Sequence, residues 1–212
     1  MDFLIHASKE RMWYVNKFLL PRLYGIPGMT YCDSHKAGNI RAYLDSLGMM
    51  AYAGGGGNTW HLEDDVFPDK RFKQRAEELE ILDGIICGFG PKGGRDVFGR
   101  IKDPKDMWFS FPCIRIPNDY ALEFAQWVEY SGDFDCERRK ALGKGIDYLF
   151  YKYVQLNPIR IFHTSPCMVQ HVDDFIGGSL INERTEPIKA IRFEDKEGLE
   201  QLKLRLQQEG KR

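Results

Sequence analysis

The sequence has no long hydrophobic run. Its longest apolar stretches, such as residues 49–53 and 85–87, are far shorter than the roughly 18 residues typical of a membrane-spanning helix. Charged side chains near the start, including Asp2, Lys9 and Arg11, also interrupt any apolar signal region. We therefore expect a cytoplasmic protein with no membrane span.

Cysteine is scarce and irregularly spaced. The five residues include no Cys-x-x-Cys pair, and their number is odd. A zinc ribbon or a disulfide framework would need paired cysteines at short, regular spacing. The pattern therefore predicts reduced thiols, most of them buried in the core.

Neither sign of charge is in excess. Thirty Lys and Arg face 31 Asp and Glu, which leaves a formal net charge of −1. Proteins held on nucleic acid by overall charge carry a basic excess, so this class is disfavoured, although a local basic face remains open. The chain is 43% hydrophobic and 13% aromatic, which is enough for a substantial core and argues against disorder.

Strand and helix patterns alternate along the chain, which favours an α/β sheet with helices on both faces. At 212 residues we expect one main domain, residues 1–186, followed by a strand and helix appendage, residues 187–212, packed on it. Glycine and proline between residues 89 and 106 predict a loop or lid. The predicted strands are residues 2–6, 30–33, 58–62 and 84–88, and the predicted helices are residues 11–23, 39–47, 69–83, 118–130, 135–156 and 197–208.

Three adjacent carboxylates follow the predicted strand 58–62. Glu63, Asp64 and Asp65 repel one another, and a neighbouring cation would relieve that repulsion. Ligands of open α/β sheets gather at the carboxyl ends of strands, and oxygen ligands there suit Mg²⁺ or Mn²⁺. The alternative is a solvated acidic turn before the break at Pro68.

A histidine in a later segment strengthens the metal interpretation. His171 follows the apolar pair Met168 and Val169 and precedes a Gly-Gly turn. Imidazole is a good ligand for Mn²⁺ beside carboxylates, although a lone histidine is more often structural. The nearby Asp173 and Asp174 are either alternative ligands or polar groups of a turn.

Together these segments resemble a known family. The stretch 62–65 resembles the DXD-type metal motif of GT-A-fold glycosyltransferases, with Glu-Asp-Asp in place of Asp-x-Asp. The stretches 145–150, 165–171 and 179–180 are similar to the C-terminal catalytic portion of the N-acetylglucosaminyltransferase IV group. The resemblance implies a single GT-A (Rossmann-like) α/β domain with a mixed central sheet and helices on both faces. A phage-type soluble transferase would be of this kind.

The resemblance also implies roles for individual residues. Asp65 and His171 would hold the metal, Mn²⁺ or Mg²⁺. Glu63 and Asp64 would bind the donor or reach the metal through water. Asp147 would be the catalytic base.

Two loops at strand ends complete the predicted donor site. In this fold the loop after the first strand meets the nucleotide, and the second strand ends at a residue that could accept from the base. Ordinary alternatives are helix-face charge for Arg11 and a helix N-cap for Asp33. The predicted donor residues outside the acidic motif are His6, Ala7, Ser8, Arg11, Asp33 and Lys36.

Asp147 has two compatible interpretations. It stands among apolar neighbours, so partial burial would raise its pKa toward a working value for a base. It is also well placed to cap the helix that follows. Asp133 and Asp135 are the alternative bases, although helix capping explains them as well.

The sequence thus predicts a metal-dependent inverting glycosyltransferase that moves a sugar from a nucleotide-sugar, UDP-linked by preference, to an acceptor hydroxyl. Basic clusters at residues 95–105 and 138–144 leave a hydroxymethylated base in DNA open as the acceptor. The alternatives are a metal-dependent nucleotide-sugar hydrolase and a non-catalytic nucleotide-binding module, which would use the same carboxylates.

Overall fold

A computed structural model describes residues 1–33, 39–54, 56–90, 112–130, 146–177, 190 and 192–210. Lys36, most of the predicted loop 89–106, both basic clusters, Asp133, Asp135 and the stretch 179–180 lie outside these residues. Within the described part of the chain, no helix has the length and apolar character needed to cross a bilayer.

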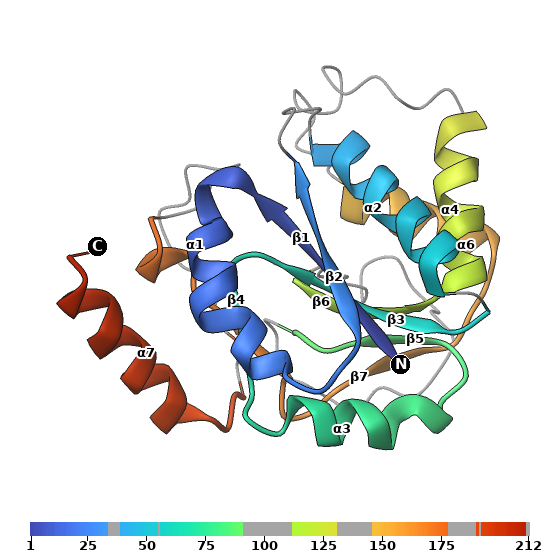
Figure 1. Cartoon of the computed structure of the whole chain (residues 1–212). Coiled ribbons are helices and arrows are strands. Elements are labelled where there is room, and N and C mark those ends of the chain that lie inside the picture. The colour runs from blue at the N-terminus through green and yellow to red at the C-terminus, as the bar shows by residue number, and fades with distance from the viewer. Residues whose placement is uncertain are drawn as a thin grey trace.

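The centre of the fold is a six-stranded mixed sheet with the strand order β2-β1-β3-β6-β5-β7 (Figure 1). Among its described strands, β6 runs antiparallel to β3 and β5, and the others are parallel to one another. A separate antiparallel pair, β4 and β8, extends from it. The strands are β1 (Asp2–Ser8), β2 (Gly28–Asp33), β3 (Asn58–Glu63), β4 (Val66–Pro68), β5 (Ile85–Cys87), β6 (Cys113–Pro117), β7 (Ile161–His163) and β8 (Val169–His171).

Helices cover both faces of the sheet (Figure 1). A continuous helical segment, residues 9–23, consists of η1 (Lys9–Arg11), α1 (Met12–Tyr14), the π-helical η2 (Val15–Leu19) and η3 (Leu20–Leu23). The other helices are α2 (Asn39–Gly54), α3 (Phe72–Glu78), η4 (Leu79–Ile81), α4 (Asn118–Tyr130), α6 (Ile146–Leu156), η6 (Asp173–Phe175) and α7 (Lys196–Gln208).

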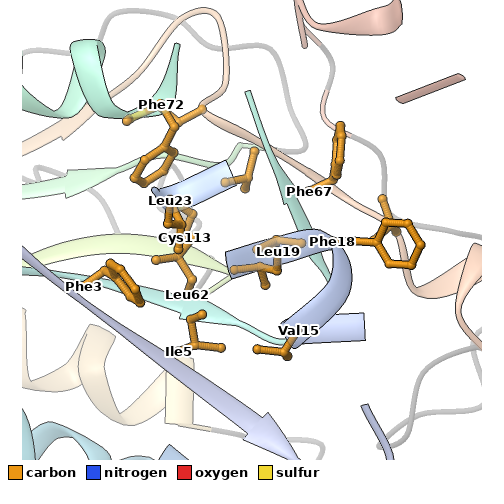
Figure 2. Close-up of a cluster of buried hydrophobic side chains, with 14 of the residues drawn as sticks. Phe3, Ile5, Val15, Phe18, Leu19, Leu23, Leu62, Phe67, Phe72 and Cys113 are labelled. Atoms are coloured by element: carbon orange, nitrogen blue, oxygen red, sulfur yellow. The ribbon is translucent and has the colours of Figure 1, made fainter. Parts of the chain in front are cut away.

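One face of the sheet packs against segment 9–23, α3 and α7. Phe3 and Ile5 of β1 and Leu62 of β3 point to this side, where Figure 2 shows them beside Val15 and Leu19. Alternation along a strand places successive side chains on opposite faces, so every second residue joins this core. Burial of these apolar groups supplies the main stabilisation of this half.

The opposite face packs against α2, α4 and α6. Leu4 of β1, Ile114 of β6 and Ile161 of β7 point to this side, together with Phe124 and Phe150 from the helices. By the same alternation, His6, His61 and Glu63 also belong to this face. Polar side chains therefore replace the apolar core toward one end of β1 and β3.

The predicted fold class is confirmed: this is an α/β protein with a mixed central sheet and helices on both faces. The four predicted strands correspond to β1, β2, β3 and β5. The predicted helices are found wherever the structure describes them, with α6 forming the later part of 135–156. In 69–83 the helix is shorter and ends in the 3-10 turn η4.

Four of the described strands were not predicted: β4, β6, β7 and β8. β6 carries the fully buried Arg115, whose guanidinium donates to the carbonyls of Leu79, Leu82 and Gly84, and a charged residue hides the apolar character of a central strand. β4, β7 and β8 have three residues each, too few for a period to be recognised, whereas the equally short β5 is marked by the apolar run 85–87. These strands define the half of the molecule that carries His171.

Candidate metal centre

The acidic motif lies where β3 ends and the short strand β4 begins. β4 pairs with β8 in a register that sets Val66 opposite His171, and Val172 N–H donates to the Asp65 carbonyl at 2.8 Å. This pairing brings two distant parts of the sequence together. One ligand atom each from Glu63, Asp65 and His171 lie within 4.8 Å of one another.

Asp65 presents its two oxygens to different partners. Oδ2 accepts a hydrogen bond from the Arg11 guanidinium at 2.6 Å. Oδ1 is buried, receives no hydrogen bond from the described residues, and faces Nε2 of His171 at 3.3 Å. A buried carboxylate oxygen that receives no hydrogen bond destabilises the folded protein unless it binds a cation or a proton. Oδ1 of Asp65 therefore fits a metal ligand.

Asp64 turns away from that cluster toward β1. Its Oδ2 accepts from the Ser8 backbone N–H at 2.7 Å and from the Ser8 hydroxyl at 2.9 Å, while Oδ1 accepts from Arg11 at 3.0 Å. Burial and the neighbouring Asp65 charge raise the pKa of Asp64, and Arg11 and Ser8 offset part of that rise. Asp64 therefore ties the acidic turn to the end of β1.

Glu63 accepts a hydrogen bond from the Tyr43 hydroxyl on α2. Burial raises the pKa of Glu63 to about 8, with the Asp65 charge acting in the same direction and the Tyr43 hydrogen bond opposing them. The protein alone thus favours a protonated Glu63 at neutral pH. A divalent cation would favour the ionised form, which is the form that coordinates.

His171 is 5% exposed and lies between two carboxylates. Its Nδ1 is 2.9 Å from Oδ1 of Asp173, and its Nε2 faces Asp65. Burial alone would lower the pKa of His171, but the hydrogen bond to Asp173 and the charge of Asp65 outweigh it and raise the pKa. Nε2 of His171 and Oδ1 of Asp65 therefore lie close enough to bind the same cation.

The predicted donor loop lies next to the acidic turn. His6 pairs with Glu63 in the β1–β3 register, and its ring packs edge-on against Tyr43 with centroids 4.5 Å apart. Burial lowers the pKa of His6 to about 4, with Asp33 opposing the shift, so the ring is neutral at physiological pH. Asp33 ends β2 directly opposite Ser8.

Two of the predicted donor residues have surroundings that the sequence did not indicate. The Ala7 side chain is fully buried in the apolar core, on the opposite face of β1 from His6. Arg11 is 4% exposed and its guanidinium is engaged by Asp64 and Asp65. Arg11 therefore serves the acidic turn in this structure, and its role toward a donor stays a prediction.

Asp147 lies in the first turn of α6 and is exposed. The expectation that it is partly buried is wrong, because α6 turns its apolar side to the sheet and leaves Asp147 outside. Its charge nevertheless raises the pKa of Glu63 and Tyr43, which places it near the acidic cluster. Its catalytic role stays a prediction.

Sequence reasoning overlooked Tyr43 and left the role of Asp173 open. Tyr43 lies on the buried face of α2, where it is indistinguishable in sequence from a core aromatic. Asp173 was considered as a metal ligand or a turn residue, and the structure sets it against Nδ1 of His171. Only the alternation of β3, which points Glu63 toward α2, hinted that α2 would supply a partner.

The sequence matches no protein-family model and no curated protein. A197 from STIV is 12% identical, covers 80% of this chain and 84% of its own, and has a TM-score of 0.45. S. aureus TarS is 12% identical over 82% of this chain and 61% of its own, with a TM-score of 0.49. A nucleoside-diphosphate-sugar pyrophosphorylase from Vibrio cholerae RC9 is 14% identical over 77% of this chain and 72% of its own, with a TM-score of 0.43.

These are partial likenesses in the path of the chain, and no residue's role follows from them. The resemblance to the N-acetylglucosaminyltransferase IV group therefore still rests on the sequence motifs alone. What the fold contributes is the position of the acidic cluster, at the carboxyl ends of the parallel strands β1, β2 and β3.

Proposed function

We propose that the chain is a metal-dependent glycosyltransferase that moves a sugar from a nucleotide-sugar, UDP-linked, to an acceptor hydroxyl with inversion. The observation that carries the proposal is the convergence of Glu63, Asp65 and His171 within 4.8 Å. The cluster lies at the strand edge where open α/β sheets bind ligands. The motif resemblance supports a nucleotide-sugar as the ligand.

Asp65 and His171 would hold the ion, with Glu63 as a further ligand or a contact to the donor. Two carboxylates and an imidazole suit Mn²⁺ better than Mg²⁺, because Mg²⁺ prefers oxygen ligands alone. When bound, the ion would supply positive charge to the diphosphate that leaves the sugar. The buried Oδ1 of Asp65, which no described residue supplies with a hydrogen bond, fits such an ion.

The donor would lie across the ends of β1 and β2. Asp33, opposite Ser8, is placed to accept from a nucleobase or ribose. His6 is neutral, so its ring can pack or hydrogen-bond without adding charge. Ser8 and Arg11 hold Asp64, which keeps the acidic turn in a fixed position beneath the donor.

Asp147 would take the proton of the acceptor hydroxyl as that oxygen attacks the anomeric carbon. Its exposure suits this role, because an acceptor must reach the base from solvent. The Asp147 charge contributes to the raised pKa of Glu63, which supports a position for Asp147 near the cluster. A hydroxymethylated base in DNA is the acceptor that we propose to test first.

Calorimetric titration with UDP tests the donor and metal assignment. We expect wild-type protein to bind UDP in the presence of Mn²⁺ and to lose most of this affinity in chelator. Asp65→Asn keeps the shape of the side chain and should abolish the Mn²⁺ dependence. Glu77→Gln, an exposed carboxylate on α3, is the matched control. Equal UDP affinity with and without Mn²⁺ would overturn the metal assignment.

Turnover assays separate transfer from hydrolysis. Release of UDP from a UDP-sugar should require the acceptor and should fall about 10²- to 10⁴-fold in Asp147→Asn, the range typical of a lost general base. UDP binding should be unchanged in that variant. Rapid UDP release without any acceptor would instead identify a hydrolase. UDP binding without turnover on any acceptor would identify a binding module.

A further inference from the structure

Each of the three residues in the metal cluster is held by a buried side chain from a different part of the fold. Glu63 is held by Tyr43 of α2, Asp65 by Arg11 of η1, and His171 by Asp173 of η6. The three supporting side chains are only 2%, 4% and 4% exposed, respectively.

In each pair, the contact engages one atom and leaves another for the cluster. Arg11 occupies Oδ2 of Asp65 and leaves Oδ1, which faces His171. Asp173 lies against Nδ1 of His171 and leaves Nε2, which faces Asp65. Tyr43 donates to Oε1 of Glu63 and leaves Oε2. The three contacts therefore orient these side chains while the second polar atom of each stays available for an ion.

Asp173 is itself fixed in place. Its Oδ1 accepts a hydrogen bond from the backbone N–H of Asp174 at 2.9 Å, and the 3-10 turn η6 begins at this residue. The carboxylate therefore meets the imidazole from a rigid position. A carboxylate 2.9 Å from Nδ1 favours the ring orientation and the tautomer whose Nε2 lone pair can bind a metal.

We propose that Asp173 and Tyr43 are positioning residues of the metal centre. Asp173 orients His171 so that Nε2 faces the ion, and Tyr43 orients Glu63 from the opposite side. The proposal rests on the metal site put forward above and adds residues outside the ligand set. In this proposal Asp173 acts on His171 rather than on the ion.

Mn²⁺ alone is the probe for this proposal. Its affinity is measured by calorimetry, and coordination by a ring nitrogen is detected by ¹⁴N modulation of the electron spin echo of bound Mn²⁺. Asp173→Ala should weaken Mn²⁺ binding about 10- to 100-fold, the usual range for a partner of a metal-ligating histidine, and should lose the ¹⁴N signal. Asp173→Asn keeps an oxygen acceptor for Nδ1–H and should retain the signal with a smaller loss of affinity.

Tyr43→Phe removes one hydroxyl and keeps the ring that packs in the core. It should weaken Mn²⁺ binding several-fold while leaving the ¹⁴N signal intact, because His171 is untouched. Asp174→Asn, the exposed neighbour in the same turn, is the matched control and should behave as wild type. Melting temperatures without metal monitor the fold of every variant.

The outcomes distinguish this proposal from the one on which it rests. Wild-type protein that binds no Mn²⁺ would remove the metal centre itself, and the positioning roles with it. Mn²⁺ binding by the wild type, with unchanged affinity and signal in folded Asp173→Ala, would overturn only the role of Asp173. Should that variant fail to fold, Asp173→Asn and Tyr43→Phe decide: wild-type affinity in both would overturn the proposal.

Discussion

An arginine at each end of the helical segment 9–23 pairs with a buried carboxylate. The two ends differ in whether both oxygens of that carboxylate have partners. At its start, Arg11 contacts Oδ2 of Asp65 at 2.6 Å. At its end, Arg22 contacts Oδ2 of Asp195 at 2.5 Å. The same kind of ion pair therefore occurs in the candidate metal centre and at the N-terminus of α7.

At the α7 end, both carboxylate oxygens are satisfied. Oδ2 of Asp195 also accepts from the Lys70 backbone N–H at 3.2 Å, and Oδ1 accepts from Gly198 N–H at 3.1 Å, which caps the helix. At the other end, Oδ1 of Asp65 receives no hydrogen bond from any residue in the described part of the chain. A carboxylate whose two oxygens both accept hydrogen bonds stabilises the fold. A carboxylate with a buried oxygen that accepts none has an atom that can bind a ligand.

Removal of Arg11 should have the largest effect. In Arg11→Met, two buried carboxylates lose their cation, and breaking a buried ion pair in this way costs about 3–5 kcal/mol of unfolding free energy. Mn²⁺ should recover part of that loss, because it supplies positive charge to Asp65, one of the two carboxylates, and binds only the folded state. Thermal melts with and without Mn²⁺ measure both effects.

The control for Arg11→Met is the other end of the segment. Arg22→Met should also lower stability, but Mn²⁺ should raise its melting temperature no more than it raises that of the wild type. If Mn²⁺ rescued both variants equally, the contrast between the two ends would be wrong.

Asp195→Ala should have the next largest effect. It removes the acceptor for Arg22, for Lys70 N–H and for the N-terminal turn of α7, and we expect a loss of about 2–3 kcal/mol from the cap and the buried hydrogen bonds. Denaturant unfolding measures the loss. Mn²⁺ affinity should not change, and a marked fall would mean that the α7 anchor supports the metal centre.

The sequence predicted many of the strands and helices that surround the two ends of segment 9–23. Short apolar or mixed runs of strand length located β1, β2, β3 and β5, and leucine spacing located α7. Such runs are not recognisable where a strand is very short and mixed in composition, as in β4, β7 and β8, or where it carries a buried charge, as in β6. The residues around Arg115 in the sequence do not indicate that its guanidinium donates to backbone carbonyls.

The acidic motif and His171 were recognised as candidates because their residue types carry the chemistry. The β4–β8 pairing brings the acidic motif and His171 together, and strands of three residues are too short for that pairing to be predicted from the sequence. Arg11 was expected to bind the donor or to be an ordinary helix-face charge, and its contacts with Asp64 and Asp65 depend on how β1 lies beside β3. Long-range juxtaposition of this kind is set by topology, which a single sequence pattern does not encode.

A pH experiment probes the metal-centre end through His6. Its pKa is lowered to about 4 in the folded protein, so its contribution to stability is full above about pH 6.5 and is lost as the pH falls toward 4. With allowance for its partial exposure, this amounts to on the order of 2 kcal/mol. Between pH 7 and 4.5, His6→Asn should lose less stability than the wild type.

The comparison with His6→Asn is needed because Glu63 changes the stability of the protein with pH in the opposite direction to His6. The pKa of Glu63 is raised to about 8, so its contribution is present at low pH and is lost as the pH rises through 8. Glu63 is present in both proteins, so the difference between their unfolding curves isolates His6. Parallel curves would show that the His6 ring does not titrate differently on unfolding.

The smallest effect should come from an ion pair that the same helical segment forms at the surface. Lys17 contacts Glu209 at 2.5 Å, but its side chain is 56% exposed, so water screens the attraction and ordering the two side chains offsets it. Lys17→Met should change the unfolding free energy by less than about 1 kcal/mol, and Mn²⁺ affinity not at all. Denaturant unfolding in low and high salt measures it. A loss as large as that of Asp195→Ala would show that burial is not what separates the strong ion pairs of this segment from the weak one.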